Sequence, residues 1–580
     1  MKVKLFILLS FLILFAISCN QAKQSDSRLD DIDFPKFESL DVTEKEFLVT
    51  NLELLGKLWG FLKYHHPAIG KGNYDWDNEL FQMIPQYLKV NSTEERDEVL
   101  LHWIEKYGEI PECKTCKETP ADAVLKPDFS WVEESDMSAF LKAKIMEIYQ
   151  NRYQGRDHYY VSILSIPVFP NEKSYSKEKN PNIELRLLAL YRYWNIIQYF
   201  FPYKHLTDTE WNDVLKKYIP KFIEARTGLE YQLVVQQLTV DICDTHAYTL
   251  LDKVDSLKGM MFAPFLVTFV ENKLVVDQFF TWLQPNGSIL KTGDIITHIN
   301  GKSVESIVDS IKIFYPASNE SVRKRIIAHD LLRSRDSTIL IDFITSNNTA
   351  RKVNLKLYDN TNYKIFSEFR KRRSSASSYK VIEINNEESI GYINLASIND
   401  GDIDTIKQLF KDRKGIIIDI RNYPNAIVFK SLGSFFVTKK RSFSKFTFGN
   451  VNKPGEFTFT NSPAYIDPDM DPYNGKLVVI VNEHTQSTAE YHTMAFRAGD
   501  NTTIIGSQTA GADGNVTNII LPGGLKTYFS GIGVYYPDGR ETQRIGIVPD
   551  IEVKPTIKGI MEGRDELLEK AIEIIRDSKR

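Results

Sequence analysis

The sequence predicts a multidomain α/β protein, and three patterns along the chain predict it. Residues 41–256 carry apolar residues at helical spacing, in two segments that resemble each other. From about residue 259 to 358 the pattern changes to short β-rich runs, and from about residue 389 onward strands alternate with helices. At roughly 150 residues per domain, a chain of 580 residues has room for about four domains.

The first residues have the features of an export signal. Lys2 and Lys4 precede a run of 13 residues, Leu5 to Ile17, that is apolar except for one serine. A membrane-spanning helix needs about 20 apolar residues, so the run fits a signal peptide over residues 1–18. Small residues then precede Cys19, which resembles the bacterial lipobox and implies lipidation of its thiol. We expect residues 19–40 to be a lipid-anchored tether; the alternative is an ordinary signal peptide with an incidental cysteine.

Composition excludes some functions. Lys plus Arg is 72 and Asp plus Glu is 76, a net charge of −4, which gives no electrostatic case for a nucleic-acid partner. No metal-binding or nucleotide-binding motif occurs, so no metal and no cofactor are expected. Cys113 and Cys116 form a single CxxC, for which a structural role, such as a local disulfide, is favoured over zinc binding.

The helical part contains an internal duplication. Trp59 and Trp194, Pro67 and Pro202, Trp76 and Trp211, and Pro85 and Pro220 are each separated by 135 residues. Four matches in one register indicate duplication, and the aromatic stripes indicate helix packing. We assign residues 41–184 to the first helical repeat and its linker, and residues 185–256 to the second repeat.

Residues 257–360 are predicted to form a β module. Phe265 to Val270 and Lys273 to Asp277 are β-rich, with Glu271 and Asn272 as the turn between them. The segment from Gly287 to Lys302 resembles the part of a PDZ domain in which Gly-Asp-Ile-Ile leads to an Ile-Asn-Gly turn. The resemblance implies a PDZ-like module, and such modules bind extended peptides by adding them as a strand.

Residues 361–580 are predicted to form the α/β domain. The apolar run Lys476 to Val481 predicts a buried strand, and Ser487 lies between it and a helix that reaches about Arg497. A nucleophile at this position would lie at a helix N-terminus, where the N–H of Thr488 could donate to an oxyanion. The alternative from local sequence is that Ser487 caps the helix.

Four segments of this domain resemble the tail-specific, or C-terminal processing, serine proteases. They are the Asn482 to Glu490 turn, Gly506-Ser-Gln-Thr-Ala-Gly511, Gly546-Ile-Val-Pro-Asp-Ile551 and the strand from Gly415 to Arg421. The resemblance covers about residues 185–580. It implies a crotonase/Clp-like α/β spiral protease domain with Ser487 as the nucleophile.

The resemblance also implies where the general base lies. Many members use a lysine at the position that is Ala512 here. A second branch, similar to the tricorn core protease, uses a histidine before the PDZ module, preceded by a hydroxyl residue that a glutamate holds. This branch implies that His246 is the base and that Thr245 orients it. Glu541, just before Gly546, is the best candidate to orient Thr245, whereas the branch places its glutamate nearer Gly546, around the position of Gln543. The alternative for His246 is packing at a helix end.

The second oxyanion donor departs from the family pattern. The family follows its Asp-x-Arg strand with Asn-x-Gly-Gly, whereas this chain has Asn422-Tyr-Pro-Asn425-Ala426. Asn425 could preserve the turn because Asn tolerates positive φ, or Ala426 could supply the N–H.

Together these features predict a serine endopeptidase that acts on exported proteins or peptides. The expected location is the bacterial cell envelope, with the lipid anchor in the outer membrane; the oligomeric state is left open. The main alternative is a weakly active or inactive relative that binds peptides through its PDZ-like module. An esterase is disfavoured because Ser487 does not lie in the Gly-x-Ser-x-Gly motif that is usual for that class. A crotonase-like acyl-CoA enzyme is disfavoured by the predicted signal peptide.

Overall fold

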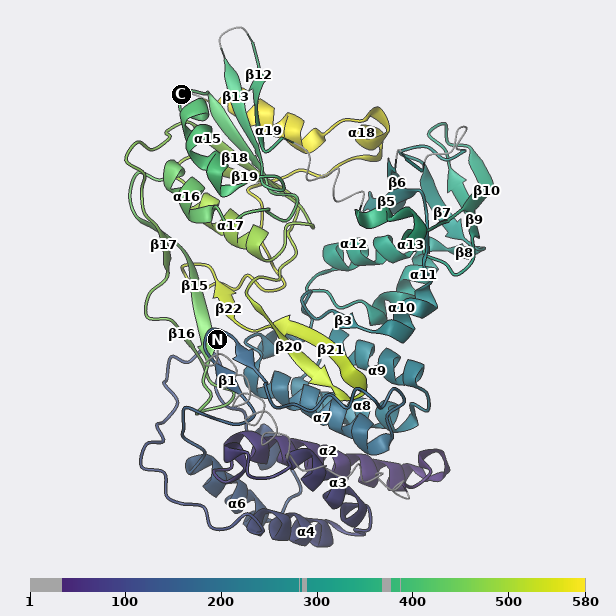
Figure 1. The fold of residues 1–580 in the computed structure, drawn as a ribbon, viewed down its shortest axis with the longest axis vertical. Coiled ribbons are helices and arrows are strands. Elements are labelled where there is room, and N and C mark those ends of the chain that lie inside the picture. The colour runs from purple at the N-terminus through teal and green to yellow at the C-terminus, as the bar shows by residue number, and fades with distance from the viewer. Residues whose placement is uncertain (1–33, 281, 284–288, 368–376, 386–387, 579–580) are drawn as a thin grey trace, which may run out of the picture. The chain divides into compact units, whose positions relative to one another are not determined.

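Two long helices, each followed by a shorter one that begins at a tryptophan, dominate the N-terminal half (Figure 1). The computed structural model describes residues 34–280, 282–283, 289–367, 377–385 and 388–578, so the predicted signal peptide, Cys19 and most of the predicted tether lie outside the described residues. The four helices are α2 (Val42–His65), α3 (Trp76–Tyr87), α7 (Ile183–Phe200) and α8 (Trp211–Glu224).

The tryptophans join each long helix to its shorter neighbour by reciprocal hydrogen bonds. The indole Nε1 of Trp59 donates to the carbonyl of Trp76 at 3.0 Å, and Nε1 of Trp76 donates back to Trp59 at 3.0 Å. Trp194 and Trp211 make the same pair of bonds, at 2.7 and 3.1 Å. The four tryptophans of the 135-residue offset therefore have matching contacts.

The two long helices cross closely where their sequences correspond. A Cβ on Gly56 would lie 2.4 Å from the ring of Tyr191, and a Cβ on Gly60 would lie 1.8 Å from Cγ of Asn195. Asn195 Nδ2 also donates to the carbonyl of Gly56 at 2.9 Å. Because 191 − 56 and 195 − 60 both equal 135, each glycine packs on the residue at its own equivalent position in the other segment.

Shorter helices complete the helical region. They are α4 (Thr93–Glu105), α5 (Ser130–Glu133), α6 (Ala139–Gln150) and α9 (Gly228–Val240), with the two-stranded pair β1 (Ser162–Ile163) and β2 (Pro167–Val168). Cys113 and Cys116 form a disulfide in the segment between α4 and α5. The chain leaves α9 through the loop that carries Thr245 and His246.

A β-rich module follows, as the sequence predicts. The turn of Glu271 and Asn272, both at positive φ, joins strand β5 to strand β6, and the sheet order is β10-β9-β7-β6-β5 with β8 paired to β7. Helix α12 packs along β5 at the edge of this sheet. The elements are α10 (Asp252–Lys258), β4 (Met261–Phe262), β5 (Phe265–Val270), β6 (Lys273–Phe279), β7 (Ile295–Ile299), β8 (Lys302–Ser303), α11 (Val304–Ile311), α12 (Glu320–Asp330), β9 (Thr338–Ile344), β10 (Ala350–Lys356), β11 (Tyr358–Asp359) and α13 (Asn360–Tyr363).

The C-terminal domain has a six-stranded sheet in the order β12-β13-β14-β18-β19-β23. Its strands run parallel except β12, and the buried runs predicted from Gly415 and Lys476 are the central strands β14 and β18. Apolar residues of α15, α16 and α17 pack on one face and those of α19 on the other. The elements are β12 (Tyr379–Glu383), β13 (Ser389–Asn394), α15 (Ile403–Phe410), β14 (Gly415–Asp419), α16 (Phe429–Gly433), β18 (Lys476–Val481), α17 (Thr488–Arg497), β19 (Thr502–Gly506), β23 (Ile551–Glu552), α18 (Ile557–Glu562) and α19 (Glu566–Asp577).

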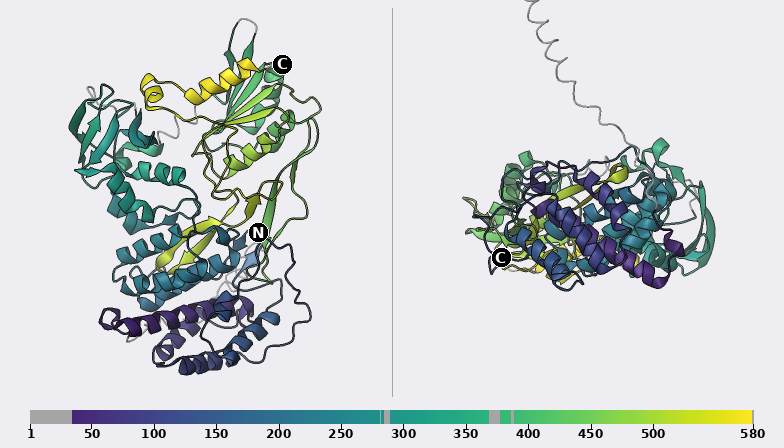
Figure 2. Two further views of the ribbon diagram at one scale, coloured as in Figure 1. Left: turned by 180° about the vertical axis from the view of Figure 1, so that it is seen from behind. Right: turned by 90° about the horizontal axis from the view of Figure 1, so that it is seen from below.

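Two further sheets extend the C-terminal domain toward the helical region (Figures 1 and 2). One joins β15, β16, β17 and β22, and the other has the order β20-β21-β3. Strand β20 contacts α7, so the C-terminal domain and the helical region meet along this strand. Residues 36–580 form one compact unit. The strands are β3 (Thr249–Leu250), β15 (Arg441–Gly449), β16 (Phe457–Phe459), β17 (Ala464–Ile466), β20 (Val516–Leu521), β21 (Leu525–Ser530) and β22 (Gly533–Tyr535).

Candidate active site

Ser487 occupies a sharp turn between a buried strand and a helix. Strand β18 ends at Val481, and α17 begins at Thr488. Ser487 has φ 55° and ψ −124°, a sparsely populated conformation that costs about 1–3 kcal/mol for a residue other than glycine. Its N–H donates to the carbonyl of Ala512 at 2.9 Å, which helps to hold the turn. Strained turns of this kind present a nucleophile at the edge of a sheet in some hydrolase folds.

The carboxylate of Glu490 joins three of the sequence motifs at one point. One of its oxygens accepts from Thr509 Oγ1 at 2.5 Å and from the N–H of Gly511 at 2.8 Å. The other accepts from the N–H of Ala512 at 3.1 Å and from that of Ser487 at 3.2 Å. All four partners donate hydrogen bonds to Glu490, which favours its ionised form. Burial has the opposite effect and raises the pKa of Glu490.

Two motif glycines are required by close approach around this carboxylate. Gly506 has φ 127°, and a Cβ there would lie 1.8 Å from the carbonyl oxygen of Val481. A Cβ on Gly546 would lie 2.4 Å from Thr509 Oγ1 and 2.9 Å from Glu490 Oε1. The spacing of the motifs therefore reflects a tightly packed turn behind Ser487.

The turn after β14 lies against the first residue of α17. The hydroxyl of Tyr423 donates to Thr488 Oγ1 at 3.0 Å. Thr488 is the first residue of α17, so its N–H has no acceptor within the helix. The N–H of Asn425 is not free, because it donates to the carbonyl of Leu395 at 2.9 Å. The N–H of Ala426 donates no hydrogen bond among the residues that the structure describes.

His246 is buried in the loop after α9, beside a carboxylate and a hydroxyl. Its Nδ1 lies 2.9 Å from Ser530 Oγ and 3.8 Å from Asp244 Oδ1. Asp244 in turn accepts from the N–H of Ser530 at 2.7 Å and from Gln543 Nε2 at 3.2 Å. Burial lowers the pKa of His246, against the opposing effect of the Asp244 charge. This environment favours a neutral imidazole whose Nε2 can accept a proton.

Thr245 and Glu541 have partners other than those expected. Thr245 Oγ1 donates to Ser318 Oγ at 3.1 Å and accepts from the N–H of Ser318 at 2.9 Å. The carboxylate of Glu541 pairs with His205. Within the described residues, Glu541 and Thr245 do not make the expected hydrogen bond to each other. An isolated β-bridge to Tyr535 positions Glu541. The residue of this segment that contacts the His246 loop is Gln543, which donates to Asp244.

The structure links the two loops through shared neighbours but not directly. No hydrogen bond joins His246 to Ser487 among the described residues. Gln543 contacts Asp244, and the N–H of the next residue, Arg544, donates to Gly511 at 2.7 Å, one residue before the Ala512 carbonyl that accepts from Ser487.

The β-rich module supplies a second link through the start of α12. Ser318 contacts Thr245, and Asn319 Nδ2 donates to the carbonyl of Thr509 at 2.9 Å. Arg325 donates to the carbonyl of Glu483 at 2.6 Å and to Gln486 Oε1 at 2.8 Å, both just before Ser487. One short segment of the module therefore contacts both loops.

Three polar residues of this region carry no motif that sequence reasoning used. Asp244 precedes Thr245 and could have been noticed by its position alone, whereas Ser530 has no local signal. Asp513 is buried, and its Oδ2 has no hydrogen-bond partner in the described part of the chain. Burial, and then the charge of Glu490, raises the pKa of Asp513.

Residues 389–553 match the model of Peptidase family S41. This part of the chain is therefore similar to peptidase family S41. The S41 segment runs from β13 to the end of the Gly-Ile-x-Pro-Asp-Ile motif, and so includes Ser487, Glu490 and the Ala426 turn but not His246.

Solved structures extend the likeness of fold beyond the S41 segment. Mature CPAF has 13% sequence identity over 69% of this chain and 99% of its own, with a TM-score of 0.54. Mature CPAF complexed with lactacystin has 13% identity over 68% and 98%, with a TM-score of 0.53. A search of curated proteins found no significant match. These likenesses concern the fold alone, and the chain is a multidomain α/β protein, as predicted.

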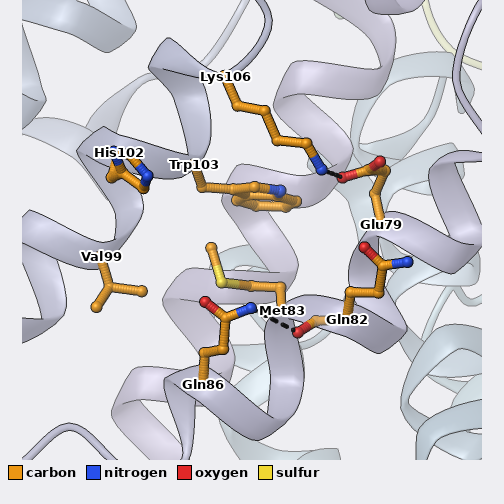
Figure 3. Close-up of a pocket in the computed structure, with 8 residues that line it drawn as sticks. All are labelled: Glu79, Gln82, Met83, Gln86, Val99, His102, Trp103 and Lys106. Carbon is orange, nitrogen blue, oxygen red and sulfur yellow. Dashed lines mark hydrogen bonds and ion pairs between the residues drawn. The ribbon is translucent and has the colours of Figure 1, made fainter.

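Other features of the described residues do not add to the site. No helix there is long and apolar enough to cross a membrane, and no group of three or more acidic, His or Cys side chains could hold a metal ion. A hollow of about 200 Å³ lies between α3 and α4 (Figure 3). It is lined by side chains such as Met83 and Trp103, and by none of the predicted site residues.

Proposed function

We propose that this protein is a serine endopeptidase that cleaves exported proteins or peptides, with Ser487 as the nucleophile and His246 as the general base. The observation that carries the proposal is the turn of Ser487. It belongs to an S41 segment, its strained backbone is held by Ala512, and it opens directly onto the N-terminus of α17.

In this proposal, Nε2 of His246 takes the proton from Ser487 Oγ as the oxygen attacks the peptide carbonyl. The new C–O bond gives a tetrahedral intermediate, whose collapse breaks the C–N bond while the imidazolium returns the proton to the leaving amine. Water then hydrolyses the acyl-enzyme by the same transfers in reverse. Because His246 and Ser487 share no hydrogen bond here, the proposal requires the two loops to approach in the substrate complex.

The surroundings of His246 support its role as base. Ser530 and Asp244 both lie beside Nδ1, which leaves Nε2 as the nitrogen for Ser487. The Asp244 carboxylate would stabilise the imidazolium that forms during the reaction. We therefore assign the orientation of His246 to Ser530 and Asp244, in place of Thr245 and Glu541.

The oxyanion is proposed to bind between the N–H groups of Thr488 and Ala426. The first has no acceptor within its own helix and lies at the N-terminus, where the helix dipole also favours negative charge. The second is supported by the free N–H of Ala426 beside the occupied N–H of Asn425. Each such donor typically contributes about 3–4 kcal/mol to transition-state stabilisation.

We further propose a PDZ-like role for the β-rich module and a lipid anchor at Cys19. An extended peptide could add to the edge strand β5 beside α12. A Cys19→Ser variant would then lose its labelling by a radioactive fatty acid and leave the membrane fraction of a bacterial host. Retention of both label and membrane location would refute the anchor.

The test of the activity is cleavage of casein or a peptide library by the purified full-length protein in detergent. Wild type should cleave, while Ser487→Ala and His246→Ala should fall to background with unchanged circular dichroism. His298→Ala, in the β-rich module, is the matched control and should keep full activity. Activity in folded Ser487→Ala would refute the proposal. Activity in His246→Ala, with Ser487→Ala inactive, would show that another group is the base.

The alternative function is an inactive or weakly active relative that binds peptides. The glycine-free turn at Asn425 and Ala426 favours it. A fluorophosphonate probe separates the two, since it labels an activated serine without requiring the correct peptide. A wild-type protein that neither cleaves nor takes up the probe would favour the binding role.

A further inference from the structure

His492 is a buried histidine of α17, five residues after Ser487, and both of its ring nitrogens are engaged. Nδ1 lies 2.6 Å from the carbonyl oxygen of Thr488, and Nε2 lies 3.0 Å from the N–H of Val428. The side chain has no exposed surface. The ring of Phe429 packs edge-on against it, with centroids 5.5 Å apart.

The two partners fix the protonation state of the ring. A carbonyl oxygen only accepts, so Nδ1 must carry a proton and donate to Thr488. A backbone N–H only donates, so Nε2 must be unprotonated and accept from the N–H of Val428. His492 is therefore neutral and in one tautomer, since burial lowers its pKa to about 4 against smaller opposing effects of the backbones of Thr488 and Ala426.

These contacts connect the two halves of the proposed oxyanion site. Thr488 is the residue whose N–H follows the nucleophile, and Val428 lies two residues after Ala426. The other contact described above between α17 and this turn, from Tyr423 to Thr488, is made by side chains, and Tyr423 is 59% exposed. The imidazole is thus a buried, backbone-to-backbone brace between the helix start and the turn.

We propose that His492 is a positioning residue that sets the separation of the Ala426 and Thr488 N–H groups. The turn lacks the glycine pair of the family pattern, and the brace to Val428 holds its backbone in place instead. This inference rests on the proposed peptidase function. It concerns geometry only, so His492 itself touches neither substrate nor Ser487.

Three substitutions in the full-length protein test the brace. His492→Phe keeps an aromatic ring but removes both hydrogen bonds. His492→Asn can reproduce the bond from Nδ1 to Thr488, and His492→Gln can reproduce the acceptor for Val428. Thr493→Val is the matched control, because Thr493 is buried on the same helix and its hydroxyl donates to the carbonyl of Ala489 at 2.8 Å.

We expect His492→Phe and His492→Asn to lower kcat by about 10- to 100-fold with KM within about twofold of wild type, less than the 10²–10³ expected when a donor is lost outright. The rate of fluorophosphonate labelling should fall by a similar factor. His492→Gln should keep kcat within about fivefold, and Thr493→Val within about twofold. If His492 had a purely structural role, all four variants would change in thermal stability, but kcat would not be lower in His492→Phe and His492→Asn than in His492→Gln and Thr493→Val.

A folded His492→Phe with kcat and labelling rate within twofold of wild type overturns the inference. If His492→Phe does not fold, the comparison of Asn with Gln decides. A kcat at least tenfold lower in Asn supports the brace to Val428, and a smaller difference overturns it. A wild-type protein that neither cleaves nor labels refutes the peptidase function and this inference with it, whereas an active wild type with insensitive His492 variants refutes the inference alone.

Discussion

The backbone N–H of Asn425 donates to the carbonyl oxygen of Leu395 at 2.9 Å. This bond ties the turn after β14 to the end of β13 and removes Asn425 as an oxyanion donor in this conformation. Ala426, whose N–H is free among the described residues, is then the donor that the turn offers.

Replacement of Ala426 by proline should therefore abolish most activity. Proline has no N–H, so we expect kcat to fall by about 10²–10³ with little change in KM. Asn425→Ala is the control, since it keeps the backbone N–H and its bond to Leu395, and should retain at least a tenth of kcat. Steady-state kinetics on a fluorogenic peptide measures both, and full activity in Ala426→Pro would exclude this donor.

The group that orients His246 can be identified by a matched pair of variants. Ser530→Ala removes the hydroxyl 2.9 Å from Nδ1, while Thr245→Val removes a hydroxyl that contacts Ser318. We expect Ser530→Ala to lower kcat at least tenfold more than Thr245→Val does. The opposite order would restore Thr245 to the role that the resemblance implied.

Asp244→Asn should lower kcat by about 10²-fold or more at neutral pH. The amide cannot stabilise an imidazolium as a carboxylate does, and in a Ser-His-Asp triad the same change costs about 10⁴. The effect on KM should be small, because Asp244 is fully buried and does not face the substrate. Equal kcat in the variant and wild type would show that this carboxylate has only a structural role.

Glu490→Gln should destabilise the α/β domain and lower activity together. The amide nitrogen would face N–H donors, leaving buried groups unpaired at a cost of about 1–3 kcal/mol. Thr509→Val loses one bond to Glu490 and should have a smaller effect on the thermal midpoint. Calorimetry compares them, and a midpoint for Glu490→Gln equal to that of wild type would contradict the arrangement.

The protein should lose stability between pH 6.5 and pH 4. Burial lowers the pKa of His66, His158 and His492 to about 4 and that of His65 to about 3, from an ordinary 6.5. Above pH 6.5 these histidines are neutral in both states, and below it the unfolded chain binds the protons. Each histidine then removes up to about 1.4 kcal/mol of stability per pH unit until its folded pKa is reached.

The thermal midpoint measured from pH 7 to pH 4 tests this sign. His65→Phe should reduce the slope, because one of the depressed groups is gone. A midpoint that rises as the pH falls through this window would contradict the prediction.

Local patterns predicted the elements on either side of Ser487. The apolar run before Ser487, the helix after it and the hairpin at Glu271 and Asn272 follow from periodicity and turn chemistry, which act between near neighbours in sequence. The S41 match confirms the family resemblance of this domain. The roles of Ser487 and His246 remain predictions.

The surroundings of His246 could not be predicted in this way. Ser530 approaches it because β21 pairs with β3, and these strands are separated by about 280 residues in the sequence. The assignment of Glu541 rested on sequence spacing, but the spacing does not tell which side chains of the Glu541 to Gln543 segment face the loop. Strands β15, β20 and β21 were not predicted either, although β20 and β21 pair as neighbours in sequence.

The contacts of Gly56 with Tyr191, and of Gly60 with Asn195, have the form of a twofold subunit interface, in which each surface packs on its own counterpart. Here both halves are on one chain, so their association is intramolecular, with an effective concentration of at least millimolar order. Dilution that separates a true dimer would leave this pair intact. The two helical repeats therefore need not be identical, as two subunits of a homodimer must be. The second repeat carries His246, and the first packs against it permanently.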